Sequence, residues 1–242
     1  LSAAAADSSD SVAPMRQFAE AVASDLRLLA RLHDREIDRE LLSALAEGGF
    51  PRSMGLRLSS KTANDAVMIL TEAVKELCWS SDDGLLDRLA VEYANIYLTY
   101  VYRASPCESP WLDDDNLERQ EPMLAVRAAY RTHGLAVAAR GVRPDDHLSF
   151  QLIFVAHLLD HHEDAADLTV IADFLDQHPL RWIKDFAQRI SQRSPVPFYV
   201  GLAVLTAAYL EELRWVLAEL TVAPDGAVPT LIIARPTAPQ PC

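Results

Sequence analysis

The chain contains few glycines, 8 among its 242 residues. Neither a GxGxxG nor a GxxxxGK[ST] motif is present, so no glycine-rich turn can bring backbone amides against a phosphate group. The HExxH, EF-hand and GxSxG patterns are absent as well. These absences exclude the nucleotide sites and hydrolytic centres that are easiest to recognise in a sequence, and we expect no cofactor.

Cysteine is also scarce: Cys78, Cys107 and Cys242 lie far apart and form no CxxC pair. We therefore expect neither a disulfide framework nor a structural zinc site, and a reducing, cytoplasmic location. Cys107 is a poor candidate nucleophile, because the neighbouring carboxylate of Glu108 would raise the pKa of its thiol.

Long apolar runs are missing too. None approaches the roughly 18–20 residues of a membrane span, so we expect no insertion into a membrane. The first residues, LSAAAADSSDSVAP, lack the basic region of a secretory signal.

Basic residues are outnumbered, with 22 Lys and Arg against 35 Asp and Glu and a formal net charge of −13. Binding to nucleic acid relies on clustered Lys and Arg, so the composition excludes a broadly basic surface for that purpose. It favours partners that are cationic or neutral.

Helical periodicity dominates what is present, whereas alternating runs of β-branched residues are almost absent. Capping residues, glycine pairs and prolines divide this pattern, most clearly in the loop of residues 103–115. The expected helices cover residues 15–33, 37–47, 60–78, 84–100, 117–140, 144–159, 165–176, 178–190 and 197–220. The sequence predicts an all-α, single-domain bundle of about nine helices over residues 15–220. Residues 1–14 are expected to be disordered or of recombinant origin, and residues 221–242 to form a proline-rich tail.

Two histidines offer the best candidate for a metal site. His157 and His161 lie four residues apart on one face of an expected helix and could both reach a metal ion. A plainer explanation is a helix C-terminus, where histidine side chains suit the helix dipole. We favour the plainer explanation and expect no metal. A metal-dependent helical-bundle enzyme using His157 and His161 stays the alternative function.

A group of tyrosines stands out more clearly. Tyr93, Tyr97 and Tyr100 share one helical face, and the helix runs directly into a loop that contains Glu108 and Trp111. Such a stripe can face the core, or it can line a groove that holds a peptide and stays wet at its rim.

A second motif, Pro144-Asp145-Asp146-His147-Leu148, begins a later helix. The proline and the acids suit a helix entrance. An imidazolium is disfavoured in a first turn, so we expect a neutral His147, able to present a donor or an acceptor to a bound chain.

These motifs, in this order, resemble the TorD/DmsD/NarJ family of redox-enzyme maturation chaperones. The resemblance spans roughly residues 20–217 and rests on Glu92–Tyr97, Pro106–Trp111, Pro144–Phe154, His178–Trp182 and Pro197–Tyr199. This chain departs from the family at Thr99, which stands where family members usually have a glycine. The departure bears on two points only, the shape of the local loop and the identity of the client enzyme.

The resemblance implies an all-helical chaperone without enzymatic activity. Such proteins bind the twin-arginine leader of a molybdopterin oxidoreductase, and often the enzyme itself, until the cofactor is inserted. By analogy the leader would contact Tyr93, Ile96, Tyr97, Glu108, Ser109, Trp111, Pro144, Asp146, His147 and Arg27. Glu108 and Asp146 are the carboxylates expected to pair with the leader arginines. The family also implies a monomer or a domain-swapped homodimer with its hinge at residues 141–145, and the client enzyme is left open.

Overall fold

The computed structural model describes residues 7–80, 82, 84–138 and 143–222. These residues form helices and loops, with one isolated antiparallel bridge between Cys107 and His147. The all-α prediction is confirmed. The elements are α1 (Asp7–Asp34), α2 (Arg39–Glu47), α3 (Lys61–Trp79), α4 (Gly84–Tyr93), the π-helical turn η1 (Ala94–Leu98), α5 (Ser109–Leu112), α6 (Glu121–Thr132), α7 (Leu148–Asp160), α8 (Ala165–Gln177), the 3-10 turn η2 (Pro179–Arg181), α9 (Ile183–Arg193) and α10 (Pro197–Val222).

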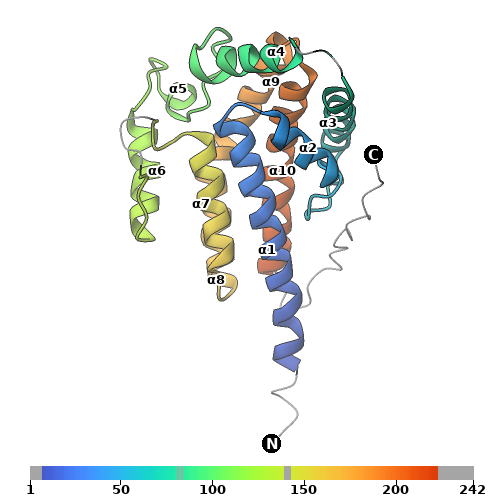
Figure 1. The fold of residues 1–242 in the computed structure, drawn as a ribbon. Coiled ribbons are helices and arrows are strands. Elements are labelled where there is room, and N and C mark those ends of the chain that lie inside the picture. The colour runs from blue at the N-terminus through green and yellow to red at the C-terminus, as the bar shows by residue number, and fades with distance from the viewer. Residues whose placement is uncertain (1–6, 81, 83, 139–142, 223–242) are drawn as a thin grey trace, which may run out of the picture.

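Three long helices, α1, α7 and α10, run side by side along the long direction of the molecule (Figure 1). Helix α1 packs on α7, and α10 packs on α3, α8 and α9. Helices α2 and α3 lie on one flank of this group and α6 lies on the other (Figure 1). The loops that carry the sequence motifs lie near one end of the bundle, around α4, α5 and α9.

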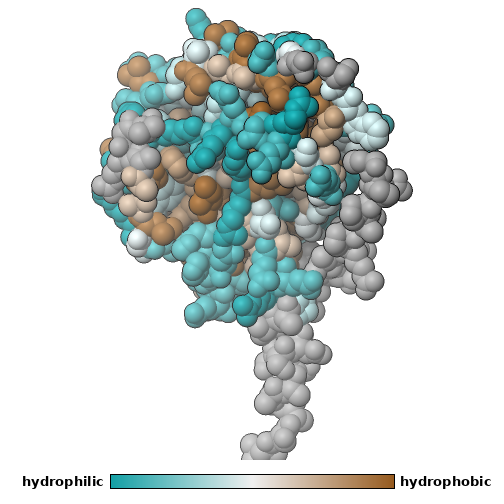
Figure 2. All heavy atoms as spheres, in the orientation of Figure 1, coloured by the Kyte–Doolittle hydropathy of each residue, from teal (hydrophilic) through white to brown (hydrophobic). Residues whose placement is uncertain are grey.

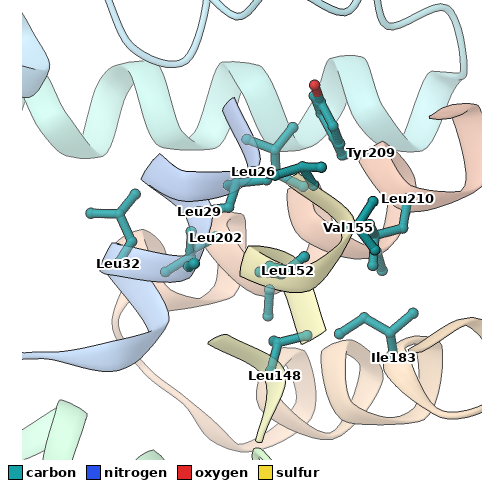
Figure 3. Close-up of a cluster of buried hydrophobic side chains, with 14 of the residues drawn as sticks. Leu26, Leu29, Leu32, Leu148, Leu152, Val155, Ile183, Leu202, Tyr209 and Leu210 are labelled. Carbon is teal, nitrogen blue, oxygen red and sulfur yellow. The ribbon is translucent and has the colours of Figure 1, made fainter. Parts of the chain in front are cut away.

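The core lies where these helices meet, as Figure 3 shows for a cluster of fully buried side chains. Leu26 and Leu29 of α1 face Leu152 of α7 and Leu202 of α10. Helix α10 is apolar around most of its circumference, which is typical of a helix enclosed by others. Burying large aliphatic side chains, each worth about 1.5–3 kcal/mol, provides the main driving force for folding this bundle.

The expected helix over residues 117–140 is wrong in length, because α6 ends at Thr132. Gly134 adopts a left-handed conformation with φ of 71°, and the amide of Leu135 bonds to the carbonyl of Tyr130 at 2.9 Å. This geometry is the glycine-dependent C-cap that closes many helices. Leu135 and Val137 continue the apolar spacing, which is why the periodicity suggested a longer helix.

Both ends of the chain also bear on the predictions. Helix α1 begins at Asp7, ahead of the expected residue 15, and α10 ends at Val222. The tail of residues 223–242 and the first part of the expected hinge, residues 141–142, lie outside the described residues. None of the helices in the described part combines the length and the apolar content that a membrane crossing needs.

Candidate functional site

The two motif loops, far apart in the sequence, lie directly against each other. The amide of Leu148 donates to the carbonyl of Pro106 at 2.8 Å, and the amide of Glu108 donates to the carbonyl of Asp146 at 3.2 Å. The Asp146 carboxylate accepts two bonds from Ser109, from its amide at 2.7 Å and its hydroxyl at 2.6 Å. We call residues 106–109 and 144–149 the motif framework.

The carboxylate of Glu108 lies inside this framework, with a residue exposure of 1%. It accepts from the amide nitrogen of Gln151 at 2.8 Å and contacts Nδ1 of His178 at 3.0 Å. The motif that begins at His178 therefore meets the Pro106–Trp111 and Pro144–Phe154 motifs here. The expected pairing of Glu108 with a leader arginine does not agree with this geometry, because the carboxylate has no open face.

Asp146 is fully buried as well, and desolvation raises the pKa of its carboxyl group. The expected contact of Asp146 with a leader arginine thus disagrees with the structure for the same reason. Burial, followed by the nearby Asp146, raises the pKa of the Cys107 thiol well above its usual value, so Cys107 is not an activated nucleophile.

His147 caps α7, and its Nδ1 accepts from the amide of Ser149 at 3.2 Å. Burial lowers the pKa of the imidazole to about 3, and the positive charge of Arg143 adds to this effect. The ring is therefore neutral near pH 7, as the helix-dipole argument predicted. Pro144 beside it is buried too, so neither residue lines an open groove in this structure.

Two members of the tyrosine stripe, Tyr93 and Tyr97, face the core, whereas Tyr100 is exposed. The Tyr93 hydroxyl donates to the carbonyl of Asp34 at 2.5 Å, and the Tyr97 hydroxyl pairs with Nδ1 of His33 at 2.7 Å. The two rings stack with centroids 4.7 Å apart, and Ile96 between them in sequence is fully buried. Burial in the core, one of the two arrangements that the sequence left open, describes Tyr93 and Tyr97 but not Tyr100. Contact of these side chains with a leader stays a prediction.

Arg27 is an exception among the expected site residues, because its side chain is exposed. It forms an ion pair with Asp160 and so links α1 to α7. Nothing in its surroundings connects it with the motif framework.

A cleft of about 820 Å³ opens on the outer side of the motif framework, next to Trp111. Its lining comes from α5, from the loops before and after it, and from α9: Tyr100, Arg103, Ser105, Pro110, Trp111, Asn116, Glu118, Asp185 and Arg189. Trp111 thus lines an open cleft, and its contact with a leader stays a prediction.

The position of Trp111 is fixed from three sides. Its indole nitrogen donates to the carbonyl of Ser105 at 2.9 Å, and its ring stacks on buried Trp182 with centroids 6.4 Å apart. The guanidinium of Arg189 lies 4.8 Å from the ring centroid, a cation–π contact. A rigid aromatic wall of this kind offers contact area without losing conformational freedom on binding.

The backbone around the cleft is unusual. In the described part of the chain, the non-glycine residues with positive φ are Tyr100 (56°), Arg103 (50°), Asn116 (58°) and Arg119 (61°). All of them lie in residues 99–103 and 113–119, which we call the rim segments. A left-handed L-residue costs about 1–2 kcal/mol, and such costs gather at ligand sites. Sequence reasoning missed these positions, since none is a glycine.

The rim segments also make specific contacts. The hydroxyl of Tyr100 bonds to the carboxylate of Glu118, which joins one segment to the other. Arg189 and Arg193 of α9 hold the first segment by donating to the carbonyls of Arg103 at 2.8 Å and Tyr102 at 3.0 Å. Thr99 has an ordinary φ of −112°, so the left-handed turn falls on Tyr100, one residue after the position where the family usually has glycine.

The two candidate metal ligands lie side by side. The His157 and His161 rings have centroids 4.1 Å apart, and Nδ1 of His161 bonds to the carbonyl of His157 at 2.8 Å. Among the residues that the structure describes, no three His, Cys, Asp or Glu side chains gather as a metal site would require.

Comparison with known proteins decides the family. Residues 61–188, more than half of the chain, match the family model described as nitrate reductase delta subunit. The chain belongs to this family. A TorD chaperone protein of Vibrio cholerae (strain M66-2) is 29% identical over 199 residues, 79% of this chain and 84% of the relative. One from Shewanella loihica is 29% identical over 190 residues, covering 76% and 87%, and one from Shewanella pealeana is 28% identical over 206 residues, covering 80% and 89%.

These findings confirm the resemblance that the motifs indicated. The relatives are named chaperones, so membership of this delta subunit family supports a molybdoenzyme maturation chaperone and not an enzyme.

Proposed function

We propose that this delta subunit family member is a cytoplasmic chaperone that binds the twin-arginine leader of a molybdenum oxidoreductase and holds the enzyme until its cofactor is inserted. The family and its named relatives support a redox enzyme as the partner. The leader chemistry follows from the resemblance: a pair of arginines followed by an apolar segment.

The observation that carries the proposal is the cleft beside Trp111. It combines aromatic walls, Trp111 and Tyr100, with two carboxylates, Glu118 and Asp185, and with the guanidinium groups of Arg103 and Arg189. Aromatic rings suit the apolar part of a leader, and carboxylates suit its arginines. Exposed apolar residues, Leu98, Val101 and Leu117, lie in or next to the rim segments and extend this surface.

We assign the buried framework residues a positioning role. Asp146 holds the backbone and hydroxyl of Ser109 at the first residue of α5, and Trp111 lies two residues further along this short helix. A change in the framework therefore moves the cleft wall without touching the leader directly. The net charge of −13 supports attraction of a cationic leader over longer distances.

Isothermal titration calorimetry tests the proposal. The partner is a synthetic twin-arginine leader of the molybdenum oxidoreductase encoded beside this gene. We expect a Kd in the micromolar range, about −8 kcal/mol, as suits a transient chaperone. Trp111→Ala should weaken binding by about tenfold or more, because an aromatic anchor is lost.

Trp79→Ala is the matched control, since Trp79 at the end of α3 is 73% exposed and does not line the cleft. It should bind the leader as the unmodified chain does. No binding heat with the leader, or equal losses in the two tryptophan variants, would contradict the proposal.

The oligomeric state is a separate part of the proposal, either a monomer or a domain-swapped homodimer. Light scattering over a concentration series distinguishes the two, because it measures the molar mass of each species. A monomer keeps the mass of one chain, whereas a domain-swapped dimer has the mass of two chains, either at all concentrations or until dilution separates them. A fixed mass other than one or two copies would contradict it.

A further inference from the structure

Glu118 differs from the carboxylates that the sequence put forward. Glu108 and Asp146 are 1% and 0% exposed, with their carboxylates bonded to Gln151 and His178 and to Ser109 respectively. Glu118 lines the cleft, is only partly buried, and has its carboxylate bonded to the phenol of Tyr100. We propose that Glu118 is the carboxylate that receives a guanidinium of the leader, and that Tyr100 occupies it in the free protein. This assignment rests on the proposed function.

The chemistry of the two donors supports an exchange. A phenol offers one neutral O–H, whereas a guanidinium offers two parallel N–H groups and a positive charge to the same carboxylate. Tyr100 is 41% exposed, so its ring can move aside without opening the core. An arriving arginine therefore replaces a weaker bond with a stronger one.

The backbone positions the carboxylate for this exchange. The Asp113 carboxylate accepts from the amides of Asp115 at 3.2 Å and Leu117 at 3.0 Å, which fixes the loop just before Glu118. On the other side, Arg189 holds the carbonyl of Arg103 and at the same time covers Trp111. The guanidinium of Arg189 is thus engaged with the cleft wall.

The left-handed residues lie at both ends of the Tyr100–Glu118 bond. Tyr100 itself has positive φ, and Arg119 follows Glu118 directly. Breaking the bond allows both rim segments to relax from a costly conformation. The Tyr100–Glu118 pair therefore acts as a latch across the cleft, closed in the free protein and opened by the leader.

Two isosteric variants test the latch, because it predicts opposite signs for the two partners of one hydrogen bond. Glu118→Gln removes the negative charge and should weaken leader binding by about tenfold or more. Tyr100→Phe keeps the ring but releases the carboxylate, so it should strengthen binding by roughly two- to fivefold. With a leader whose two arginines are replaced by glutamine, both variants should bind as the unmodified chain does.

The chain supplies a matched control pair. The Tyr102 hydroxyl donates to the carboxylate of Glu92 at 3.0 Å, a bond of the same type next to the cleft but outside its lining. Tyr102→Phe and Glu92→Gln should not change leader affinity in opposite directions. If Tyr100→Phe and Glu118→Gln both weaken binding, the pair is structural and the latch is wrong. Unchanged affinity in Glu118→Gln overturns the assignment as well.

A smaller probe separates this assignment from the proposed function. The dipeptide arginyl-argininamide carries two guanidinium groups without an apolar segment, and NMR titration detects weak binding to the full chain. We expect chemical-shift changes in the rim segments that Glu118→Gln abolishes. If the dipeptide gives them and the full leader does not bind, the proposed function fails and the guanidinium site stands. If the leader binds and the dipeptide produces no Glu118-dependent shifts, the guanidinium site fails alone.

Discussion

The motif framework and the rim segments lie next to each other but differ in burial and in backbone conformation. The framework is buried, and hydrogen bonds from backbone and side chains join its two loops to each other and to neighbouring residues. The rim segments are largely exposed, and they contain the left-handed residues. In our proposal, most residues that identify the family do not touch its ligand: the framework holds the wall of a cleft, and Trp111, the last residue of the Pro106–Trp111 motif, lines that cleft together with Tyr100 and Glu118.

Removing a framework carboxylate should have the largest effect on stability. Asp146→Ala leaves the buried amide and hydroxyl of Ser109 without their acceptor, which should lower the free energy of unfolding by about 3 kcal/mol. Urea denaturation measures this value. Asp185→Ala, an exposed carboxylate of the cleft, should change it by less than about 0.5 kcal/mol. Equal effects of the two substitutions would remove the distinction between framework and rim.

Acid should weaken the framework through its neutral histidine. The pKa of His147 falls from its usual 6.5 to about 3 in the folded chain. Below pH 6.5 the unfolded chain therefore takes up a proton that the folded chain does not, and stability falls as pH drops, by about 1.4 kcal/mol per pH unit.

His147→Asn keeps an acceptor at the start of α7 and removes this titration. Between pH 7 and pH 5 the variant should lose about 2 kcal/mol less stability than the unmodified chain. Asp25, whose pKa is raised to about 6 by burial, acts in the opposite sense, since stability is lost as pH rises through its folded pKa. It acts equally in both proteins and cancels in the difference. If the free energies of unfolding of the two proteins change with pH in the same way, the His147 imidazole is not held neutral in the folded chain.

The sequence predicted the helices better than the site, since Glu108 and Asp146 were expected at an open groove and are buried. Apolar spacing predicts which residues share a helical face, but it does not say whether that face meets the core or a ligand. Tyr93 and Tyr97 illustrate this, because their partners, the carbonyl of Asp34 and the ring of His33, come from a distant helix. Positive φ at Tyr100 or Arg103 has no signature in the sequence, whereas the turn at Gly134 had one that the spacing of Leu135 concealed.

The smallest expected effect on stability comes from the left-handed backbone of the rim segments. Arg103→Gly places glycine at φ of 50°, where it fits without steric cost, and should stabilise the chain by about 0.5 kcal/mol. Arg57→Gly is the matched control at an exposed arginine with ordinary φ, and it should destabilise the chain by about 0.5–1 kcal/mol. Thermal denaturation resolves the sign. Destabilisation of similar size in both variants would mean that the rim segments carry no strain.

Hydrogen exchange with and without the leader tests most directly whether the rim segments, and not the buried framework, receive the peptide. Our account predicts slower exchange at the amides of residues 99–103 and 113–119 when the leader is bound, with residues 106–109 and 144–149 unchanged. Slower exchange confined to residues 106–109 and 144–149, with the rim segments unaffected, would contradict it.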